Sequence, residues 1–450
     1  MGVIHRFAAM CSTYRLDDLL RRCWEKSVEE RRRYRKKTLR ATPILDYTQP
    51  SLPPQLDEAT RKQSILFVVH RYWPSIGGTE HFTQQLAEKF AKDGHSVMVL
   101  CHCDDIASTF EKEEEGILWR EIAHEGVRIV EYRHKRPPKG LFTELLTDDP
   151  SMLRFSKALL KREQPDFVHI THLQMGAAMA TACNDVGVRY GVTLTDFFCL
   201  CHYFTLIDRK GTFCTRHDCD KRCPKWGQSG EKRYEKASIL LAEAAFVAAP
   251  SHFVAARIHA EYSVQVYVIP HDVELPANFL REEHADVAEV HLLYAGKLTP
   301  LKGLQELLPS LAACDDSFLL TICGGGNPFF ERKLKRMVRD DRRFRFMGTL
   351  SRDELWKEYA RTDAVIIPSL CPETYSFTAH EAIAAGCRVI ATPMGALPEA
   401  VEESGGKMLY AIGSDVDNKY IATIKREGRP LSLSIHKNEV ESYKLLYRRK

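Results

Sequence analysis

The feature that most constrains the fold is a regular alternation of short apolar runs and amphipathic segments that begins near residue 64. Residues 65–70 form an apolar run rich in β-branched side chains, which is typical of a strand buried on both faces of a parallel sheet. A turn with proline and glycine follows, and residues 80–93 then have the apolar spacing of a helix that stops at Gly94. Strands and helices in alternation predict a doubly wound α/β fold.

The alternation occurs twice, on either side of a polar and irregular stretch at 271–289. We therefore expect two Rossmann-like domains that face each other across a cleft, with ligand groups at the carboxyl ends of the strands. The predicted organisation is a basic helical leader and linker (1–63), an N-terminal Rossmann-like domain (64–280) with a cysteine-rich insertion (199–223), a C-terminal Rossmann-like domain (281–430) and a C-terminal helix (431–450).

Composition excludes several classes of protein. The chain has 450 residues, of which 44% are hydrophobic, so it can bury a sizeable core and is not disordered throughout. No stretch approaches the roughly 20 apolar residues that span a bilayer, and the start of the chain lacks the pattern of a secretion signal. These observations predict a cytoplasmic protein.

The net charge of +4 is unevenly distributed. Residues 1–40 carry 12 Lys or Arg and 5 Asp or Glu, whereas the remaining residues carry 52 and 55. The body of the chain therefore gives no reason to expect nucleic acid as a partner. The leader at 13–40 has two interpretations: a peripheral contact with the anionic inner face of a membrane, or a solvated helix packed on the body.

Three glycine-rich or lysine-bearing segments follow predicted strands. Gly77 and Gly78 precede a predicted helix, where backbone N–H groups can approach an anion, although such a turn can also be purely structural. Lys297 and Lys302 flank the loop that opens the second series and could neutralise a diphosphate, or form a solvated basic turn. The triplet 324–326 indicates close backbone approach or a flexible turn.

A fourth segment carries two carboxylates. Glu373 lies in the loop after a predicted strand, and Glu381 lies in the helix that follows. Both can face one cleft, where a carboxylate can accept hydrogen bonds from hydroxyl groups or stabilise positive charge on a sugar ring. The alternative is two solvated carboxylates.

Taken together, these four segments resemble the retaining GT-B glycosyltransferases of the GT4 type over residues 64–450. The most specific element runs from Pro372-Glu373-Thr374 to Gly386, and it is similar to the variant common among bacterial O-antigen and surface-polysaccharide transferases. The resemblance implies transfer of a sugar from a nucleotide-sugar donor to a hydroxyl of a glycan or lipid-linked acceptor, with retention at the anomeric carbon. It also implies that catalysis needs no metal or other cofactor.

The resemblance assigns roles to individual residues. Glu373 would be the catalytic residue, beside the donor sugar. Donor-binding roles fall on the glycines of the first turn, the two lysines, the amides at the start of the following helix and the second glutamate: Gly77, Gly78, Lys297, Lys302, Tyr375, Ser376, Phe377 and Glu381.

The sequence departs from the family at three of these positions or their neighbours. Lysine replaces the usual arginine at Lys297, serine replaces a frequent glycine at Ser376, and threonine replaces a frequent histidine at Thr195. The nearby histidines that could substitute are His169, His172 and His202. Two other functions stay open: a nucleotide-sugar epimerase of the same architecture, and a non-catalytic nucleotide-sugar-binding relative.

The cysteines cluster in the insertion at 199–223. Four of them have spacings that could close a structural zinc site: Cys201, Cys214, Cys219 and Cys223. No CxxC pair is present. Free thiols and disulfides are the alternative interpretations.

Overall fold

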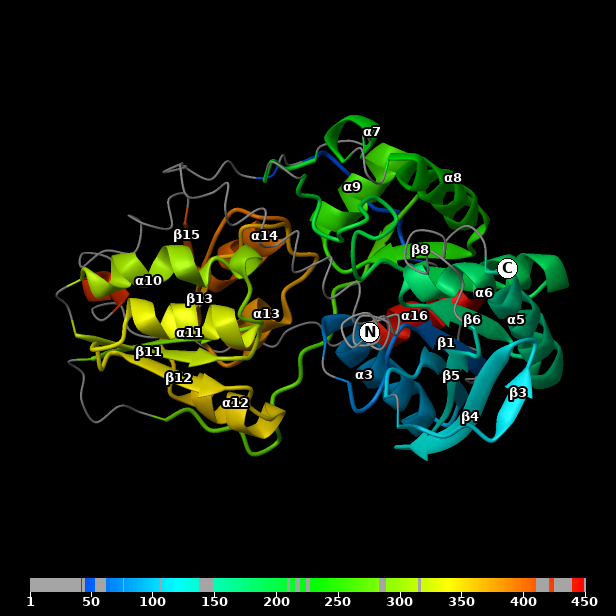
Figure 1. Ribbon diagram of the computed structural model, residues 1–450, viewed down its shortest axis with the longest axis horizontal. Coiled ribbons are helices and arrows are strands. Elements are labelled where there is room, and N and C mark those ends of the chain that lie inside the picture. Colours follow the sequence, from blue (N-terminus) through cyan, green and yellow to red (C-terminus); the bar gives the residue numbers. More distant parts are fainter. Residues whose placement is uncertain are drawn as a thin grey trace, which may run out of the picture. The chain divides into compact units, whose positions relative to one another are not determined.

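The computed structural model describes residues 42, 45–52, 62–75, 77–105, 107–136, 149–208, 211–214, 219–223, 227–282, 289–314, 317–409, 421–424 and 439–448. The leader at 13–40 lies outside these residues. The chain divides into two compact units (Figure 1). Within the described residues, unit 1 comprises 45–271 and 439–448, and unit 2 comprises Thr42 and 272–424.

Unit 1 is built on a nine-stranded sheet with the order β3-β4-β5-β2-β1-β6-β7-β8-β9. Its strands are β1 (Ser64–Val69), β2 (Ser96–His102), β3 (Lys112–Glu114), β4 (Ile117–His124), β5 (Val127–His134), β6 (Phe167–Ile170), β7 (Tyr190–Thr193), β8 (Phe246–Ala249) and β9 (Tyr267–Val268). From β5 to β9 every pair is parallel, whereas β3, β4 and β5 form an antiparallel meander at one edge. The sequence alternation predicts no strand for this meander.

The helices of unit 1 are α3 (Gly78–Lys92), α5 (Pro150–Glu163), α6 (Leu173–Val186), α7 (Cys219–Arg222), α8 (Gly227–Glu243), α9 (His252–Tyr262) and α16 (Glu439–Arg448). The last of these, α16, follows unit 2 in the sequence but belongs to unit 1. In Figure 1 its red ribbon lies among the blue and green elements of unit 1. Tyr443 and Tyr447 of α16 are fully buried, and the ring of Tyr447 stacks on Phe167.

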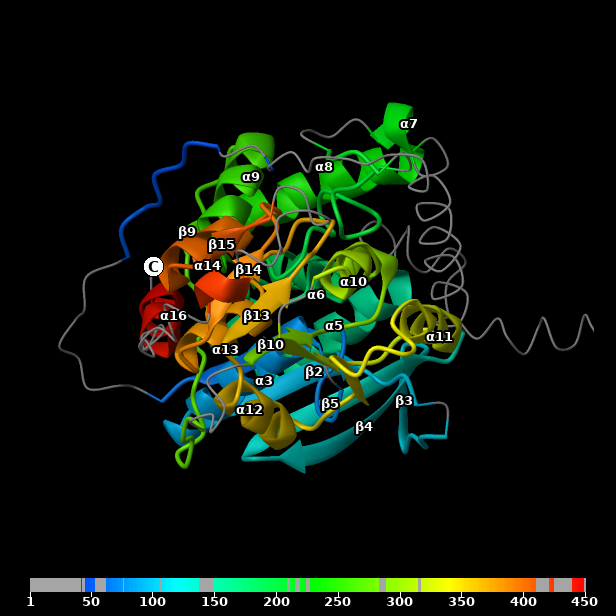
Figure 2. The ribbon, with the colours of Figure 1, turned by 90° about the vertical axis from the view of Figure 1, so that its left-hand side faces the viewer.

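Unit 2 has a six-stranded, entirely parallel sheet with the order β12-β11-β10-β13-β14-β15. The strands are β10 (Val290–Ala295), β11 (Phe318–Cys323), β12 (Phe344–Gly348), β13 (Ala364–Ile367), β14 (Arg388–Ala391) and β15 (Lys407–Met408). The helices are η2 (Pro300–Lys302), α10 (Leu304–Ala312), α11 (Pro328–Met337), α12 (Arg352–Ala360), α13 (Phe377–Ala384) and α14 (Leu397–Ser404). Figure 2 shows α10 and α11 side by side on this sheet.

Each sheet has a topological switch point, where the strand order reverses. In unit 1 the chain moves outward from β1 to β2 and β5, and then returns to the other side of β1 with β6. In unit 2 it moves from β10 to β11 and β12, and returns with β13. Open α/β sheets bind ligands at the carboxyl ends of the strands at such points. Ligand-binding residues are therefore expected at the ends of β1, β6 and β7 in unit 1 and at the ends of β10 and β13 in unit 2.

The stretch before residue 64, predicted as a linker, has fixed contacts where it is described. The Tyr47 hydroxyl donates to Val266 O at 2.7 Å, and Gln49 Oε1 accepts from Val268 N at 2.9 Å. Thr42 N donates to Pro393 O at 3.0 Å in unit 2. Across the described residues, no helix is both long and apolar enough to cross a membrane.

Candidate functional site

In unit 2 the loop after β10 is fixed by contacts between backbones. Gly303 has φ of +72°, and a Cβ there would lie 1.8 Å from Pro368 O, so only glycine fits between the loops after β10 and β13. A Cβ on Gly324 would lie 1.9 Å from Gly296 O. The predicted close backbone approach at 324–326 is therefore real, but it is made to the chain's own loop at 296–298, which supports the purely structural interpretation of this triplet.

The structure brings together two predicted residues that are 71 positions apart. Lys302 Nζ lies 2.5 Å from Glu373 Oε1, and Ser369 Oγ donates to the same oxygen. Lys302 is at the end of η2, and Glu373 is in the loop after β13, so the pair joins the two strand ends of the switch point. The second lysine, Lys297, is exposed, and its backbone oxygen accepts from the hydroxyl of buried Tyr294 at 3.0 Å.

The backbone of Glu373 is held by the loop after β14. Glu373 N donates to Met394 O at 3.3 Å, and Ala396 N donates to Glu373 O at 2.9 Å. Gly395, at φ of +70°, has no room for a side chain, because a Cβ would lie 2.2 Å from Glu373 O. The position of this carboxylate is thus fixed by two neighbouring strands. Burial, and then the charge of Glu373, raises the pKa of Tyr294.

The helix α13 begins at Ser376, which has φ of +73°. The Ser376 side chain caps the helix by accepting from Ala379 N at 3.4 Å. Tyr375 is buried and stacks on His380 with ring centroids 3.8 Å apart, so its ring supports the helix start from within. The N–H groups of the first helical turn, which a helix cannot use internally, lie beside the Glu373 loop. The side chain of Phe377 is half-buried.

Glu381 is not a solvated carboxylate. It is 4% exposed, it accepts from the Tyr359 hydroxyl at 2.9 Å, and it lies 2.9 Å from Arg352 Nη1. The pKa of Tyr359 is raised by burial and by this carboxylate. Both partners come from α12, and the sequence analysis missed them. The only signal was their place in the helix that precedes β13.

In unit 1 the first predicted turn is the start of α3. Gly77 is the N-cap, with extended backbone that any residue can adopt, and Gly78 is exposed. The next residue, Thr79, donates from Oγ1 to Thr195 Oγ1 at 2.9 Å, and Thr195 donates in turn to Thr171 O at 2.9 Å. Thr195, after β7, thus links the start of α3 to the end of β6 by hydroxyl hydrogen bonds.

An imidazole does lie at this edge of the sheet, at a different position in the sequence. His172, after β6, places Nε2 2.7 Å from Asp196 Oδ2, after β7. The His172 ring stacks on His70 at 5.5 Å, and its Nδ1 atom is buried without a hydrogen-bond partner. Of the three histidines considered from the sequence, His172 is therefore the one paired with Asp196.

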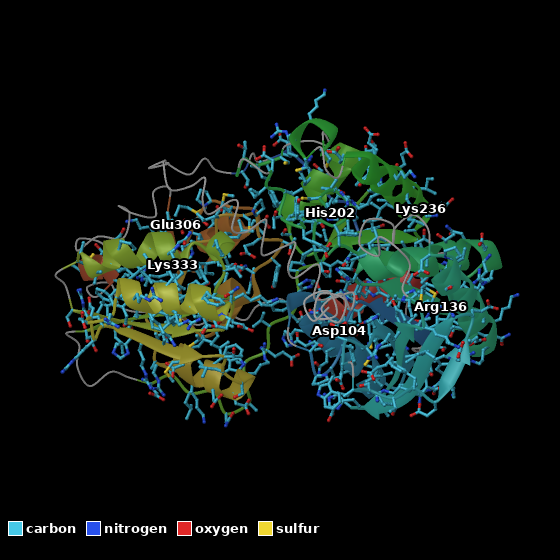
Figure 3. The ribbon with its side chains drawn as sticks, viewed as in Figure 1. Asp104, Arg136, His202, Lys236, Glu306 and Lys333 are labelled. Carbon is cyan, nitrogen blue, oxygen red and sulfur yellow. The ribbon has the colours of Figure 1, made fainter. Side chains whose placement is uncertain are left out.

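The other two histidines have different partners. His169 is fully buried, with Nδ1 2.6 Å from the Tyr447 hydroxyl and Nε2 2.8 Å from Thr193 Oγ1. Burial lowers the pKa of His169 to about 3, so the ring is neutral. His202, labelled in Figure 3, lies in the insertion and has Nδ1 3.4 Å from Arg233 Nη1.

The cysteines of the insertion do not form a ready-made metal site. Among the residues that the structure describes, no three His, Cys, Asp or Glu side chains are grouped to hold a metal ion, and no cysteine forms a disulfide. Burial raises the pKa of Cys214, and the nearby Cys201 thiol adds to this effect. With Cys219 and Cys223, these thiols make up the predicted zinc ligands, and the zinc site stays a prediction.

Solved structures with the same architecture identify the fold. Sucrose-phosphate synthase from Thermosynechococcus elongatus has a TM-score of 0.63 at 18% identity, over 86% of this chain and 95% of that one. The Anabaena protein Alr3699/HepE, solved in complex with UDP and glucose, has a TM-score of 0.55 at 16% identity, over 86% and 93%. The two Rossmann-like sheets thus define a GT-B fold, which confirms the predicted fold class.

Two family models then identify the chain more narrowly. Residues 76–275 match Glycosyltransferase Family 4, and residues 289–426 match Glycosyl transferases group 1. The chain belongs to these GT4-type glycosyltransferases. A D-inositol 3-phosphate glycosyltransferase from Corynebacterium glutamicum (strain R) is 34% identical over 120 residues, which are 24% of this chain and 28% of that protein. The match thus spans under a third of this curated relative.

Proposed function

We propose that the chain transfers a sugar from a nucleotide-sugar donor to a hydroxyl acceptor, with retention at the anomeric carbon. The observation that carries this proposal is the pairing of Lys302 with Glu373 at the switch point of unit 2, beside the start of α13. A cation, a carboxylate and helix N–H groups meet there at one sheet edge. These are the groups that a charged diphosphate and the hydroxyls of a sugar require.

The donor diphosphate is assigned to the lysines and to the start of α13. Lys302 now neutralises Glu373, and an incoming diphosphate would share its ammonium with that carboxylate. Lys297 is exposed and can turn toward the same anion. With this charge supplied by side chains and helix N–H groups, the proposal requires no catalytic metal. The UDP and glucose named in the Anabaena structure support a nucleotide sugar as the donor.

The sugar and the ribose are assigned to the two glutamates. Glu373 is 16% exposed at its side chain, so its carboxylate is accessible to donor hydroxyls while its backbone stays fixed. Glu381 would bind the ribose hydroxyls of the donor. It already accepts a hydroxyl hydrogen bond from Tyr359, which shows the chemistry that a ribose hydroxyl would need, but it must release Arg352 or share an oxygen to do so.

The edge of unit 1 is assigned to the acceptor and to sugar hydroxyls. Gly78 is exposed and has no side chain, so the backbone at the start of α3 is accessible to a ligand. His172 and Asp196 supply an imidazole and a carboxylate that can bind hydroxyl groups. In this assignment His172 takes the role of the histidine that the family resemblance would place at position 195, where this chain has threonine. The acceptor is proposed to be a glycan or lipid-linked glycan of a bacterial cell surface, which rests on the likeness of the segment from Pro372 to Gly386 to the O-antigen variant.

The test is a thermal-shift panel of UDP-, GDP-, ADP- and dTDP-sugars, followed by release of nucleoside diphosphate from each sugar that stabilises the protein. We expect one nucleotide class to raise Tm, because a ligand that binds only the folded state stabilises it. Release of the nucleoside diphosphate, together with NMR evidence that the product keeps the donor's anomeric configuration, would establish the reaction. Treatment with EDTA is expected to leave the release rate unchanged.

Two other outcomes would overturn this proposal in favour of a named alternative. Stabilisation by a nucleotide sugar without any turnover, in the presence of a broad set of glycan acceptors, would indicate a non-catalytic binding protein. Release of nucleoside diphosphate with inversion of a sugar carbon and no acceptor would indicate an epimerase. Failure of all four donor classes to stabilise the protein would contradict donor binding itself.

A further inference from the structure

A strongly basic surface lies on unit 2, on the helix that follows the glycine triplet 324–326. Residues 328–345, which span α11 and the start of β12, contain eight Lys or Arg and three Asp or Glu. The body of the chain outside the leader contains 52 and 55, so this short stretch is basic against an acidic background. Such local charge has a physical consequence, since it attracts anionic surfaces.

The charge is concentrated on one face of α11. Phe330 and Leu334 are buried and pack into the core of unit 2. With 3.6 residues per turn, the opposite face consists of Phe329 and the residues three, six and seven positions after it. We call these residues the outer face of α11, and all four are exposed: Phe329, Arg332, Lys335 and Arg336.

Two of the three acids in this stretch have partners outside this face. Glu331 accepts from Gly326 N at 2.7 Å, and Asp341 lies 2.6 Å from Arg343 Nη2. Lys333, labelled in Figure 3, turns instead toward α10, where it donates to Gln305 Oε1 at 3.1 Å. Across the described part of the chain, no carboxylate forms a salt bridge with Arg332, Lys335 or Arg336.

An aromatic side chain accompanies these cations. Phe329 is 77% exposed, and the Arg332 guanidinium lies over its ring at 4.7 Å. Met337, at the end of the helix, is 36% exposed. Exposed aromatic and apolar side chains among cations fit the boundary between lipid headgroups and acyl chains, where the ring enters the apolar layer and the cations stay with the headgroups.

We propose that the outer face of α11 docks on an anionic membrane surface. The cations meet the negative headgroups, and Phe329 enters the interfacial layer. This docking goes beyond the proposed transfer reaction, which requires no lipid contact at α11. Nucleic acid is the rival occupant for a basic surface, but single-strand sites stack successive bases on several aromatic rings, whereas the outer face of α11 presents one exposed ring.

The experiment is sedimentation of the full chain with vesicles of phosphatidylcholine alone and of an equimolar mixture with phosphatidylglycerol. We expect binding to the mixed vesicles only, and weaker binding as salt is added. The double variant Lys335→Glu/Arg336→Glu is expected to bind them at least about tenfold more weakly. The control, Lys92→Glu/Lys161→Glu, reverses two exposed helix lysines of unit 1 and is expected to bind as the wild type does.

A second variant tests the apolar part of the contact. Phe329→Ser leaves every cation in place, and it is expected to weaken vesicle binding by about threefold or more through lost apolar burial. Vesicle binding that survives Lys335→Glu/Arg336→Glu would overturn the proposal and assign the contact to another segment, such as 13–40. Oligonucleotide binding that the double variant abolishes, with vesicle binding insensitive to Phe329→Ser, would also overturn it. Stabilisation by nucleotide sugars, measured on the same variants, tests the proposed function separately.

Discussion

The strand ends of the two units are built with different chemistry. In unit 2 the carboxylates are paired with cations, Glu373 with Lys302 and Glu381 with Arg352. In unit 1 hydroxyl groups join the start of α3 to the ends of β7 and β6, from Thr79 through Thr195 to Thr171. An ionic edge can exchange one charged partner for another and suits a diphosphate, whereas a hydroxyl and imidazole edge suits neutral sugar hydroxyls. Both sheets have a switch point, and under the proposed function the loops of unit 2 bind the donor diphosphate while those of unit 1 bind hydroxyl groups.

The strongest test of the ionic edge is Lys302→Met. The variant removes the cation that neutralises Glu373 and that we assign to the diphosphate, so we expect kcat/KM to fall by about 100- to 1000-fold. Lys297→Met is the matched comparison and is expected to cost less, since Lys297 is exposed. Nucleotide release at several salt concentrations measures both. Equal activity of Lys302→Met and wild type would remove the charge-based distinction between the two edges.

A second test concerns the ribose assignment. Glu381→Gln keeps an acceptor for Tyr359 but loses the ion pair with Arg352, and we expect the donor KM to rise by about 10- to 100-fold. Glu402→Gln, which changes an exposed carboxylate on α14, serves as the control. Steady-state kinetics with varied donor, together with Tm, separates binding from folding. A large fall in Tm with an unchanged donor KM would make Glu381 a structural residue.

The edge of unit 1 is tested by His172→Gln. We expect kcat/KM to fall by about tenfold through loss of the bond to Asp196, with little dependence on salt. Asp196→Asn breaks the same pair from the other side, so the double variant should be no worse than the poorer single variant. Fully additive losses would show that the two residues act independently. A loss that depends on salt would contradict the proposed difference between the ionic contacts of unit 2 and the hydrogen bonds of unit 1.

The buried histidine of unit 1 predicts a pH effect on stability. The pKa of His169 is lowered by burial from 6.5 to about 3, so the unfolded chain takes up a proton first as the pH falls. The contribution of neutral His169 to the free energy of unfolding is therefore fully present above pH 6.5 and is lost progressively between pH 6.5 and 3. Urea unfolding should show about 2 kcal/mol less stability at pH 5 than at pH 8 from this residue. His169→Gln should be less stable at neutral pH but less sensitive to acid. An unchanged pH slope in that variant would refute the assignment.

The smallest effect is expected at Ser376, where unit 2 has a non-glycine residue at φ of +73°. Ser376→Gly relieves a backbone strain of about 1 kcal/mol but loses the cap to Ala379, so Tm should change little. Ser376→Ala loses the cap and keeps the strain, and is expected to cost about 1 kcal/mol. Thermal unfolding compares the two. A clear gain on Ser376→Gly would mean that the cap contributes nothing, and a clear loss would mean that it dominates.

The parallel strands were largely predictable, because continuous β-branched runs mark strands buried on both faces. The meander from β3 to β5 was not, since β3 is short and charged, β4 mixes polar and apolar side chains, and charged residues interrupt the apolar side chains of β5. At the candidate site, Glu373 and Lys302 were predicted separately, but their pairing depends on register between strands far apart in the sequence. Arg352 and Tyr359 were missed because nothing in their local pattern distinguishes them from ordinary helix residues. His172 could not be singled out from its neighbours until the fold placed it beside Asp196.

The return of α16 to unit 1 has a consequence for how the chain is made. The main segment of unit 2, Asp272–Lys437, is inserted between two segments of unit 1. Tyr447 stacks on Phe167 and bonds to His169, so these core residues lack their final neighbour until the ribosome has translated the whole of unit 2. Unit 1 is the first to begin synthesis and the last to be completed. A nascent chain must therefore hold an unfinished apolar surface while an entire second domain emerges.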